Sequence, residues 1–190
     1  MHGVRSTLAA SLLALLAGCQ SQPPQPAAPA HDGPLELGTL EGMNGQSYDV
    51  DAELDRGETV ALVFWQTWCE SCEKEAPSIA KAAADNAGKI RFIGIVPGKD
   101  GTVVDSEVRA TADTWGYAAF PHVRDRDMSL TRKLGVSGTP TILVLAKGGQ
   151  VVFNGHRPPA DWAPFQGAAF DASTAGGCEG GVCPLPAASE

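Results

Sequence analysis

The sequence predicts an α/β fold in which helices flank a central mixed β-sheet. The apolar run 60–65 has the composition of a strand buried on both faces, and a helical pattern at 73–87 separates it from a second apolar run at 90–96. This strand–helix–strand order is typical of neighbouring parallel strands. Later in the chain, 142–146 and 151–153 flank a glycine-containing turn and predict an antiparallel hairpin, so the sheet is expected to be mixed.

Composition and charge exclude some broad classes of function. The chain has 190 residues, of which 43% are hydrophobic and 19% charged, which predicts one domain with a real hydrophobic core. Its 22 acidic against 14 basic residues give a net charge of −8, which argues against a protein that binds nucleic acid through a basic face. The five cysteines are an odd number, so at least one has a fate other than pairing within the chain.

Residues 1–18 end in an apolar run that is shorter than the ~20 residues that a membrane-spanning helix needs. We therefore interpret them as a secretory signal and not as a membrane-spanning helix. The segment Leu16-Ala17-Gly18-Cys19 resembles the lipobox of bacterial lipoproteins, in which the cysteine carries the lipid. An ordinary signal peptide cleaved nearby is the alternative. Gln20 after the cysteine suggests, by the same resemblance, sorting to the outer membrane. The proline-rich residues 19–34 predict an extended tether.

The remaining elements complete the expected domain. An N-terminal β-hairpin is predicted around the two-residue turn Asn44-Gly45, with Tyr48 and Val50 in its second strand. Between the second buried strand and Pro140 the chain predicts an insertion composed of a helix, a short strand and a short helix, at 103–115, 121–123 and 128–134. A last helix is expected within 159–170, with Trp162 and Phe165 as its apolar residues.

The motif Cys69-Glu70-Ser71-Cys72 lies between the first buried strand and the helix that follows it. Two intervening residues place both sulfurs on one helical turn, close enough to form a disulfide. At a helix N-terminus, unpaired amides and the helix dipole favour the Cys69 thiolate, which is the nucleophile of thiol–disulfide exchange, and Cys72 would resolve the mixed disulfide. Half of a four-cysteine zinc site and a purely structural disulfide are the alternatives.

The segment Phe64-Trp65-Gln66-Thr67-Trp68-Cys69-Glu70-Ser71-Cys72 resembles the active-site segment of thioredoxin-fold proteins, and most of all that of the TlpA/ResA-like membrane-anchored thiol-disulfide oxidoreductases. Pro77 matches the helix-kinking proline of that fold, and Gly138-Thr139-Pro140-Thr141 resembles its cis-proline segment. The resemblance implies a thioredoxin-like fold over residues 35–170. It also implies a cis peptide bond before a proline that faces the disulfide, and a substrate groove formed by Trp68, Thr139 and Pro140.

The sequence departs from ordinary thioredoxins at Val63, where those proteins carry a buried aspartate. Glu75 matches a glutamate that the TlpA/ResA-like proteins use near their cysteines, and this resemblance implies a proton relay that tunes the thiol pKa; a solvated helix residue is the alternative. The carboxylates of Glu70, Glu73 and Glu75 oppose a thiolate at Cys69. We therefore expect a reductant of disulfides rather than a strong oxidant.

The remaining cysteines and histidines carry weaker signals. His122 and His156 are isolated from any ligand spacing and are expected to be satisfied loop or strand-end residues, although His156, at the end of the hairpin, has the position to approach the active site. The tail 171–190 contains Cys178 and Cys183, which predict a short structural disulfide loop. A second redox pair that exchanges with the active-site cysteines and a metal-capturing pair are the alternatives. No metal site is predicted.

These features predict a lipid-anchored, periplasm-facing thiol-disulfide oxidoreductase of the bacterial cell envelope, of the protein-disulfide reductase type. Its partners would be client proteins with disulfides, the membrane through the anchor, and a redox partner that regenerates the dithiol. No flavin or nucleotide motif is present, so no cofactor is expected. The alternative function is a non-enzymatic thioredoxin-fold lipoprotein that acts as a metallochaperone or binding adaptor.

Overall fold

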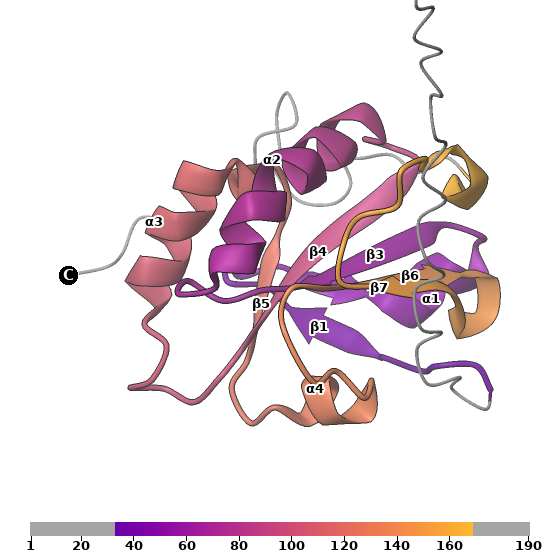
Figure 1. Cartoon of the computed structure of the whole chain (residues 1–190). Coiled ribbons are helices and arrows are strands. Elements are labelled where there is room, and N and C mark those ends of the chain that lie inside the picture. The colour runs from indigo at the N-terminus through magenta and orange to yellow at the C-terminus, as the bar shows by residue number, and fades with distance from the viewer. Residues whose placement is uncertain (1–32, 169–190) are drawn as a thin grey trace, which may run out of the picture.

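The computed structural model describes residues 33–168, which are built around a five-stranded mixed sheet (Figure 1). The strand order is β5-β4-β3-β6-β7. Strands β3, β4 and β5 are parallel, whereas β6 runs antiparallel to β3 and β7 antiparallel to β6. The strands are β3 Thr59–Phe64, β4 Ile90–Pro97, β5 His122–Asp125, β6 Thr141–Ala146 and β7 Gln150–Gly155. The mixed sheet expected from the sequence is confirmed.

Helices and a small hairpin cover the two faces of this sheet (Figure 1). Helices α2 Glu70–Asp85 and α3 Asp105–Trp115 lie on one face. Helix α1 Val50–Asp55, helix α4 Ser129–Lys133 and the hairpin of β1 Thr39–Glu41 with β2 Ser47–Asp49 lie on the other. Three short 3-10 turns complete the described elements, η1 Tyr117–Ala119, η2 Lys147–Gly149 and η3 Ala163–Phe165.

Strand β3 divides the interior into two cores, because successive side chains of a strand point to opposite faces. Ala61, Val63 and Trp65 pack toward α2 and α3, and we call the cluster on this face the α2-side core. The alternate residues of the strand pack toward α1 and α4 in the α1-side core; these are Val60, Leu62 and Phe64. All six side chains are completely buried, as expected for a central strand that is covered on both faces.

The helix–strand insertion is also confirmed. Helix α3, η1, β5 and α4 lie between β4 and β6 in the chain, and β5 joins the edge of the sheet beside β4. Helix α3 begins at Asp105 and ends at Trp115, and its C-cap is Gly116, whose φ of 74° is the left-handed conformation that favours glycine after a helix.

Three local predictions are corrected. The N-terminal hairpin forms, but its turn spans Gly42–Gln46 rather than the two residues Asn44-Gly45, because the Gly42 N–H donates to the Gln46 carbonyl. Val50 starts helix α1 instead of ending a strand, since the Asp49 side chain caps the first turn. Helix α2 starts at Glu70, three residues before the predicted position, because Cys69 itself is its N-cap.

The last helix predicted within 159–170 is wrong for the residues that the structure describes. Only η3 forms there, and Pro164 lies within its first turn. A helix over 159–170 would carry Pro164 in its interior, where the missing backbone N–H and the ring of a proline disfavour a continuous helix. Trp162 and Phe165 still pack on the α2-side core, with a ring-centroid distance of 5.0 Å between Trp162 and Phe92.

Several predictions fall outside the described residues. These are the signal 1–18, nearly all of the tether 19–34, the lipidation site Cys19, and the tail 171–190 with Cys178 and Cys183. Within residues 33–168, no helix combines the length and the apolar character that crossing a membrane requires.

Candidate active site

The two active-site cysteines lie where strand β3 passes into helix α2. Cys69 is the N-cap of α2, and its sulfur forms a disulfide with Cys72 at an S–S distance of 2.09 Å. The Cys72 N–H donates a hydrogen bond to Cys69 Sγ at 3.1 Å. Cys69 is 6% exposed whereas Cys72 is fully buried. Cys69 is therefore the outer cysteine of the pair, and Cys72 is enclosed by the α2-side core.

The charge around Cys69 has two opposing sources. The first-turn amides of α2 and the helix dipole favour a negative charge at its N-terminus. Glu70 and Glu73 lie in the same turn and are exposed, so their repulsion of a thiolate is screened by water but remains. The described residues place no lysine, arginine or histidine within the Cys69–Cys72 motif that would add to the helix contribution.

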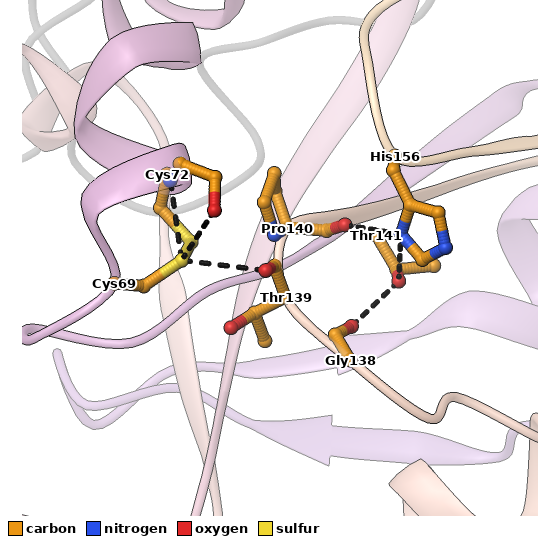
Figure 2. Close-up of a disulfide and its surroundings, with 8 residues drawn as sticks. Cys69, Cys72, Gly138, Thr139, Pro140, Thr141 and His156 are labelled. Atoms are coloured by element: carbon orange, nitrogen blue, oxygen red, sulfur yellow. Dashed lines mark hydrogen bonds between the residues drawn. A yellow bond between two sulfur atoms is a disulfide. The ribbon is translucent and has the colours of Figure 1, made fainter.

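The predicted cis-proline segment lies directly opposite the disulfide (Figure 2). The peptide bond between Thr139 and Pro140 is cis, and the Thr139 carbonyl oxygen lies 3.4 Å from Cys69 Sγ. Trp68, next to Cys69, is 72% exposed, which is unusual for a tryptophan. The Thr139 carbonyl thus lies beside the outer sulfur and the exposed Trp68 directly precedes Cys69, while the substrate groove itself stays a prediction.

Glu75 lies one turn beyond Cys72, and its side chain is 24% exposed. The Arg157 Nε atom, from the segment after β7, lies 3.6 Å from Glu75 Oε1. Burial and the negative charge of Glu75 raise the pKa of Tyr117 far above its usual value. The carboxylate therefore lies between an exposed cation and a buried phenol, at the border between solvent and the interior behind Cys72.

An aromatic cluster fills the α2-side core behind the motif. His122 is 1% exposed, and its ring centroid lies 5.4 Å from that of Trp65. Burial lowers the His122 pKa to about 4, so at neutral pH the ring is uncharged, and its Nε2–H donates to the Tyr117 carbonyl at 3.0 Å. A β-carbon on Gly94 would lie 2.1 Å from His122 Nδ1, which explains why only glycine fits beneath the ring.

Three polar atoms of this cluster are buried without a hydrogen-bond partner among the described residues: Trp65 Nε1, the Tyr117 hydroxyl and His122 Nδ1. The sequence predicts that His122 has hydrogen-bond partners. This prediction is correct for Nε2 and wrong for Nδ1. Sequence reasoning missed this cluster, because nothing in the local pattern shows that Tyr117 and His122 converge on Trp65.

His156 was singled out by position alone, and the structure places it against the cis-proline segment (Figure 2). Its Nδ1 atom lies 2.8 Å from the Pro140 carbonyl oxygen. Arg157 was missed entirely. The available signal was the hairpin: an antiparallel strand that pairs with β6 must end beside the start of β6, where Pro140 lies.

Metal ligands do not gather in the described part of the chain. No group of three or more histidine, cysteine, aspartate or glutamate side chains has the arrangement to hold a metal ion within residues 33–168. The two sulfurs of the motif are used by the disulfide.

Known proteins with similar sequences include thiol-disulfide oxidoreductases. The Redoxin family matches residues 27–163. The thiol-disulfide oxidoreductase ResA of Bacillus subtilis is 29% identical over 114 residues, which cover 60% of this chain and 60% of ResA. The soluble secreted antigen MPT53 of Mycobacterium bovis is 36% identical over 128 residues, covering 67% of this chain and 69% of MPT53. The chain spans less than two thirds of the length of the first two curated relatives that it matches, 64% of one and 61% of the other.

A solved structure agrees with these sequence matches. A secreted Mycobacterium tuberculosis disulfide oxidoreductase, described as homologous to E. coli DsbE, superposes with a TM-score of 0.52 at 25% identity, over 64% of this chain and 84% of that chain. The expected thioredoxin-like fold and the resemblance to TlpA/ResA-like proteins are confirmed. With its family match over most of the described residues and a cysteine pair at the start of α2, the chain belongs to the Redoxin family.

Proposed function

We propose that this protein is an extracytoplasmic thiol-disulfide oxidoreductase that reduces or exchanges disulfides in client proteins. The observation that carries the proposal is the Cys69–Cys72 disulfide at the N-terminus of α2, with the Thr139 carbonyl 3.4 Å from the outer sulfur. This arrangement gives an accessible sulfur, a buried resolving sulfur and a free backbone edge for an extended client chain. The named activities of ResA and of the structural relative support it.

The reaction follows from the positions of the two sulfurs. In the reduced protein, the Cys69 thiolate attacks one sulfur of the client disulfide, which forms a mixed disulfide and releases the other client sulfur as a thiolate. The Cys72 thiolate then attacks Cys69 Sγ, which restores the Cys69–Cys72 disulfide and releases the second client sulfur. The client disulfide gains two electrons and the protein dithiol loses two. The leaving client thiolates take up protons from solvent or from a nearby acid.

Glu75 is the proposed proton-handling group. Cys72 is fully buried and must lose a proton before it attacks, whereas solvent reaches Glu75. A carboxylate at this border can accept the proton and pass it to water, a task that Val63 in strand β3 has no group to perform.

The direction of electron flow is proposed to be toward the client. A strong oxidant of this type needs a highly stabilised thiolate, because that stabilises the reduced protein. Here Glu70 lies between the two cysteines and Glu73 follows them, so two negative charges oppose the thiolate. We expect a potential nearer to about −270 mV, which is typical of thioredoxin, than to about −120 mV, which is typical of DsbA.

The proposed setting is the cell envelope. The name of MPT53 and the description of the structural relative both indicate secretion, which supports a location outside the cytoplasm, where disulfide-bearing clients occur. The finer proposal is a lipid anchor on Cys19 after removal of residues 1–18, with residues 19–34 as a tether and Gln20 directing the protein to the outer membrane. Palmitate labelling that depends on Cys19, with Cys19→Ala as control, would support the anchor, and equal labelling of both would refute it.

Reduction of insulin with dithiothreitol as electron donor tests the activity itself. We expect turnover by the wild type and none above background for Cys69→Ser, because only Cys69 Sγ is accessible to the client. Trapping then identifies clients: Cys72→Ala leaves the mixed disulfide unresolved, so clients remain bound through Cys69. No Cys69-dependent reduction would contradict the proposal and favour the non-enzymatic binding role.

The tail cysteines are proposed to form a structural loop that does not take part in turnover. The double variant Cys178→Ser/Cys183→Ser is expected to keep both the insulin-reduction rate and the redox potential of the wild type. A changed potential or rate would instead assign the pair to electron exchange with the active site.

A further inference from the structure

Strand β7 ends beside the cis-proline segment, and the residue that follows it reaches that segment. Gly155, at the end of β7, pairs with Ile142 near the start of β6. His156 comes next, and its Nδ1 atom lies 2.8 Å from the Pro140 carbonyl oxygen and 3.3 Å from Thr141 Oγ1. Figure 2 shows the imidazole on the side of Pro140 that faces away from the disulfide.

The hydrogen bonds determine which atom carries the proton. Thr141 Oγ1 donates its one hydrogen to the Gly138 carbonyl at 2.7 Å, so it can only accept from His156. The Pro140 carbonyl is also an acceptor. His156 Nδ1 must therefore carry a hydrogen, which it shares between the Pro140 carbonyl and the Thr141 hydroxyl oxygen.

These bonds hold the two peptide groups that flank the cis Thr139–Pro140 bond, which are Gly138–Thr139 and Pro140–Thr141. The Gly138 carbonyl and the Thr139 N–H belong to one peptide plane and point in opposite directions, so a hydrogen bond that holds the carbonyl also sets the direction of the N–H. The Pro140 carbonyl, beyond the cis bond, is held by His156 directly. Among residues 33–168, no hydrogen bond uses the Thr139 N–H, which leaves it free for a client strand.

We propose that His156 is a positioning residue for client binding: through Thr141 and the Pro140 carbonyl it orients the Thr139 peptide groups that pair with the client backbone. It touches neither the sulfurs nor the client. The proposal rests on the proposed function, because it assigns a role within client docking. A small disulfide that has no peptide backbone does not use this edge and should not respond to His156.

The test compares a protein disulfide with a small one. With dithiothreitol as donor, we expect His156→Ala to raise KM for insulin about fivefold, an effect of the size expected from one lost hydrogen bond, with kcat unchanged. The second-order rate constant of the reduced variant with hydroxyethyl disulfide and the redox potential should equal those of the wild type. Val152→Ala, at an exposed position of β7, the strand that ends just before His156, is the matched control and should leave all four quantities unchanged.

Conservative variants separate positioning from simple packing. An asparagine side chain places its N–H₂ near the position of histidine Nδ1, whereas glutamine places it near Nε2. We therefore expect His156→Asn to restore most of the insulin KM and His156→Gln to behave like alanine. Equal loss in both, or no change in KM in His156→Ala, would overturn the proposal.

A double variant tests the route through Thr141. If both residues act on the same peptide groups, His156→Ala/Thr141→Val should raise KM by less than the product of the two single effects. A strictly multiplicative result would refute the shared route. If the wild type reduces neither insulin nor hydroxyethyl disulfide, the proposed function fails, whereas a wild type active on both with an unaffected His156→Ala fails only this inference.

Discussion

The two sides of the sheet are packed in different ways. The α1-side core is mainly aliphatic, with Leu54, Leu62 and Ile93 fully buried. Its buried charges are paired, since Arg91 Nε lies 2.6 Å from Glu53 Oε2, and burial is the main cause of the raised Glu53 pKa. Even the Tyr48 hydroxyl has partners in the hairpin turn. On this side the Arg91–Glu53 pair and the Tyr48 hydroxyl have partners, whereas Glu58 Oε2 is buried without one among the described residues.

The α2-side core contains the cysteines and a cluster of aromatic rings instead. Trp65, Tyr117 and His122 each bury a polar atom that has no partner among the described residues, an arrangement that costs stability. The reactive motif is attached to this side, because Trp65 directly follows β3 and Cys72 lies in the first turn of α2. The α1-side core therefore mainly stabilises the fold, whereas the α2-side core accepts less favourable packing around the cysteine pair.

The largest expected effect comes from removing the outer sulfur, Cys69 Sγ, which lies on the α2 side of the sheet. Cys69→Ser should reduce insulin turnover by more than about 1000-fold, because the hydroxyl is a far poorer nucleophile at neutral pH. Its denaturation midpoint should match that of the reduced wild type, which circular dichroism measures. Substantial remaining turnover would place the nucleophile elsewhere.

A substitution in the α1-side core should instead lower the stability and leave turnover nearly unchanged. Leu62→Ala removes a fully buried side chain and is expected to lower the free energy of unfolding by about 3 kcal/mol, from lost burial and the cavity left behind. Urea denaturation measures this loss. Turnover per folded molecule should stay within about twofold of the wild type, and a large loss of turnover would show that the two cores are not separate in function.

Acid should destabilise the protein through the α2 side. The His122 pKa is lowered to about 4 in the folded chain against about 6.5 unfolded, so as pH falls below 6.5 the unfolded chain takes up a proton that the folded chain refuses. Between pH 7 and pH 5 this linkage should remove about 2 kcal/mol of stability. His122→Phe, which keeps a ring but cannot titrate, should lose correspondingly less in the same urea titrations. Identical pH slopes for both proteins would contradict this account.

The exposed ion pair of the site should matter least for folding. Arg157→Gln removes the contact with Glu75, in which the arginine side chain is 69% exposed. The unfolding free energy should change by less than about 0.5 kcal/mol, since water and salt screen such pairs. A loss above 1 kcal/mol in urea denaturation would mean that the pair stabilises the fold and does not merely flank the proposed proton route.

The sequence was sufficient wherever the signal was local. The apolar run at 60–65, the helical pattern after it and the position of Cys69 between them predicted β3, α2 and the disulfide, because strand composition, helix period and capping act over a few residues. The same local signals failed at the short helix α1. They also failed at 159–170, where apolar spacing suggested a helix whose interior Pro164 would have occupied.

Local patterns in the chain were therefore enough to predict the α/β architecture and the cysteine pair at a helix start, and the resemblance to TlpA/ResA-like proteins indicated the segment opposite that pair. Only the tertiary structure placed His156 on the Pro140 carbonyl, Arg157 beside Glu75, and the rings of Tyr117 and His122 against Trp65. The physical reason is that these contacts join segments distant in the chain. Their geometry depends on strand order, register and the packing of whole faces, and no local pattern of residues encodes those distances.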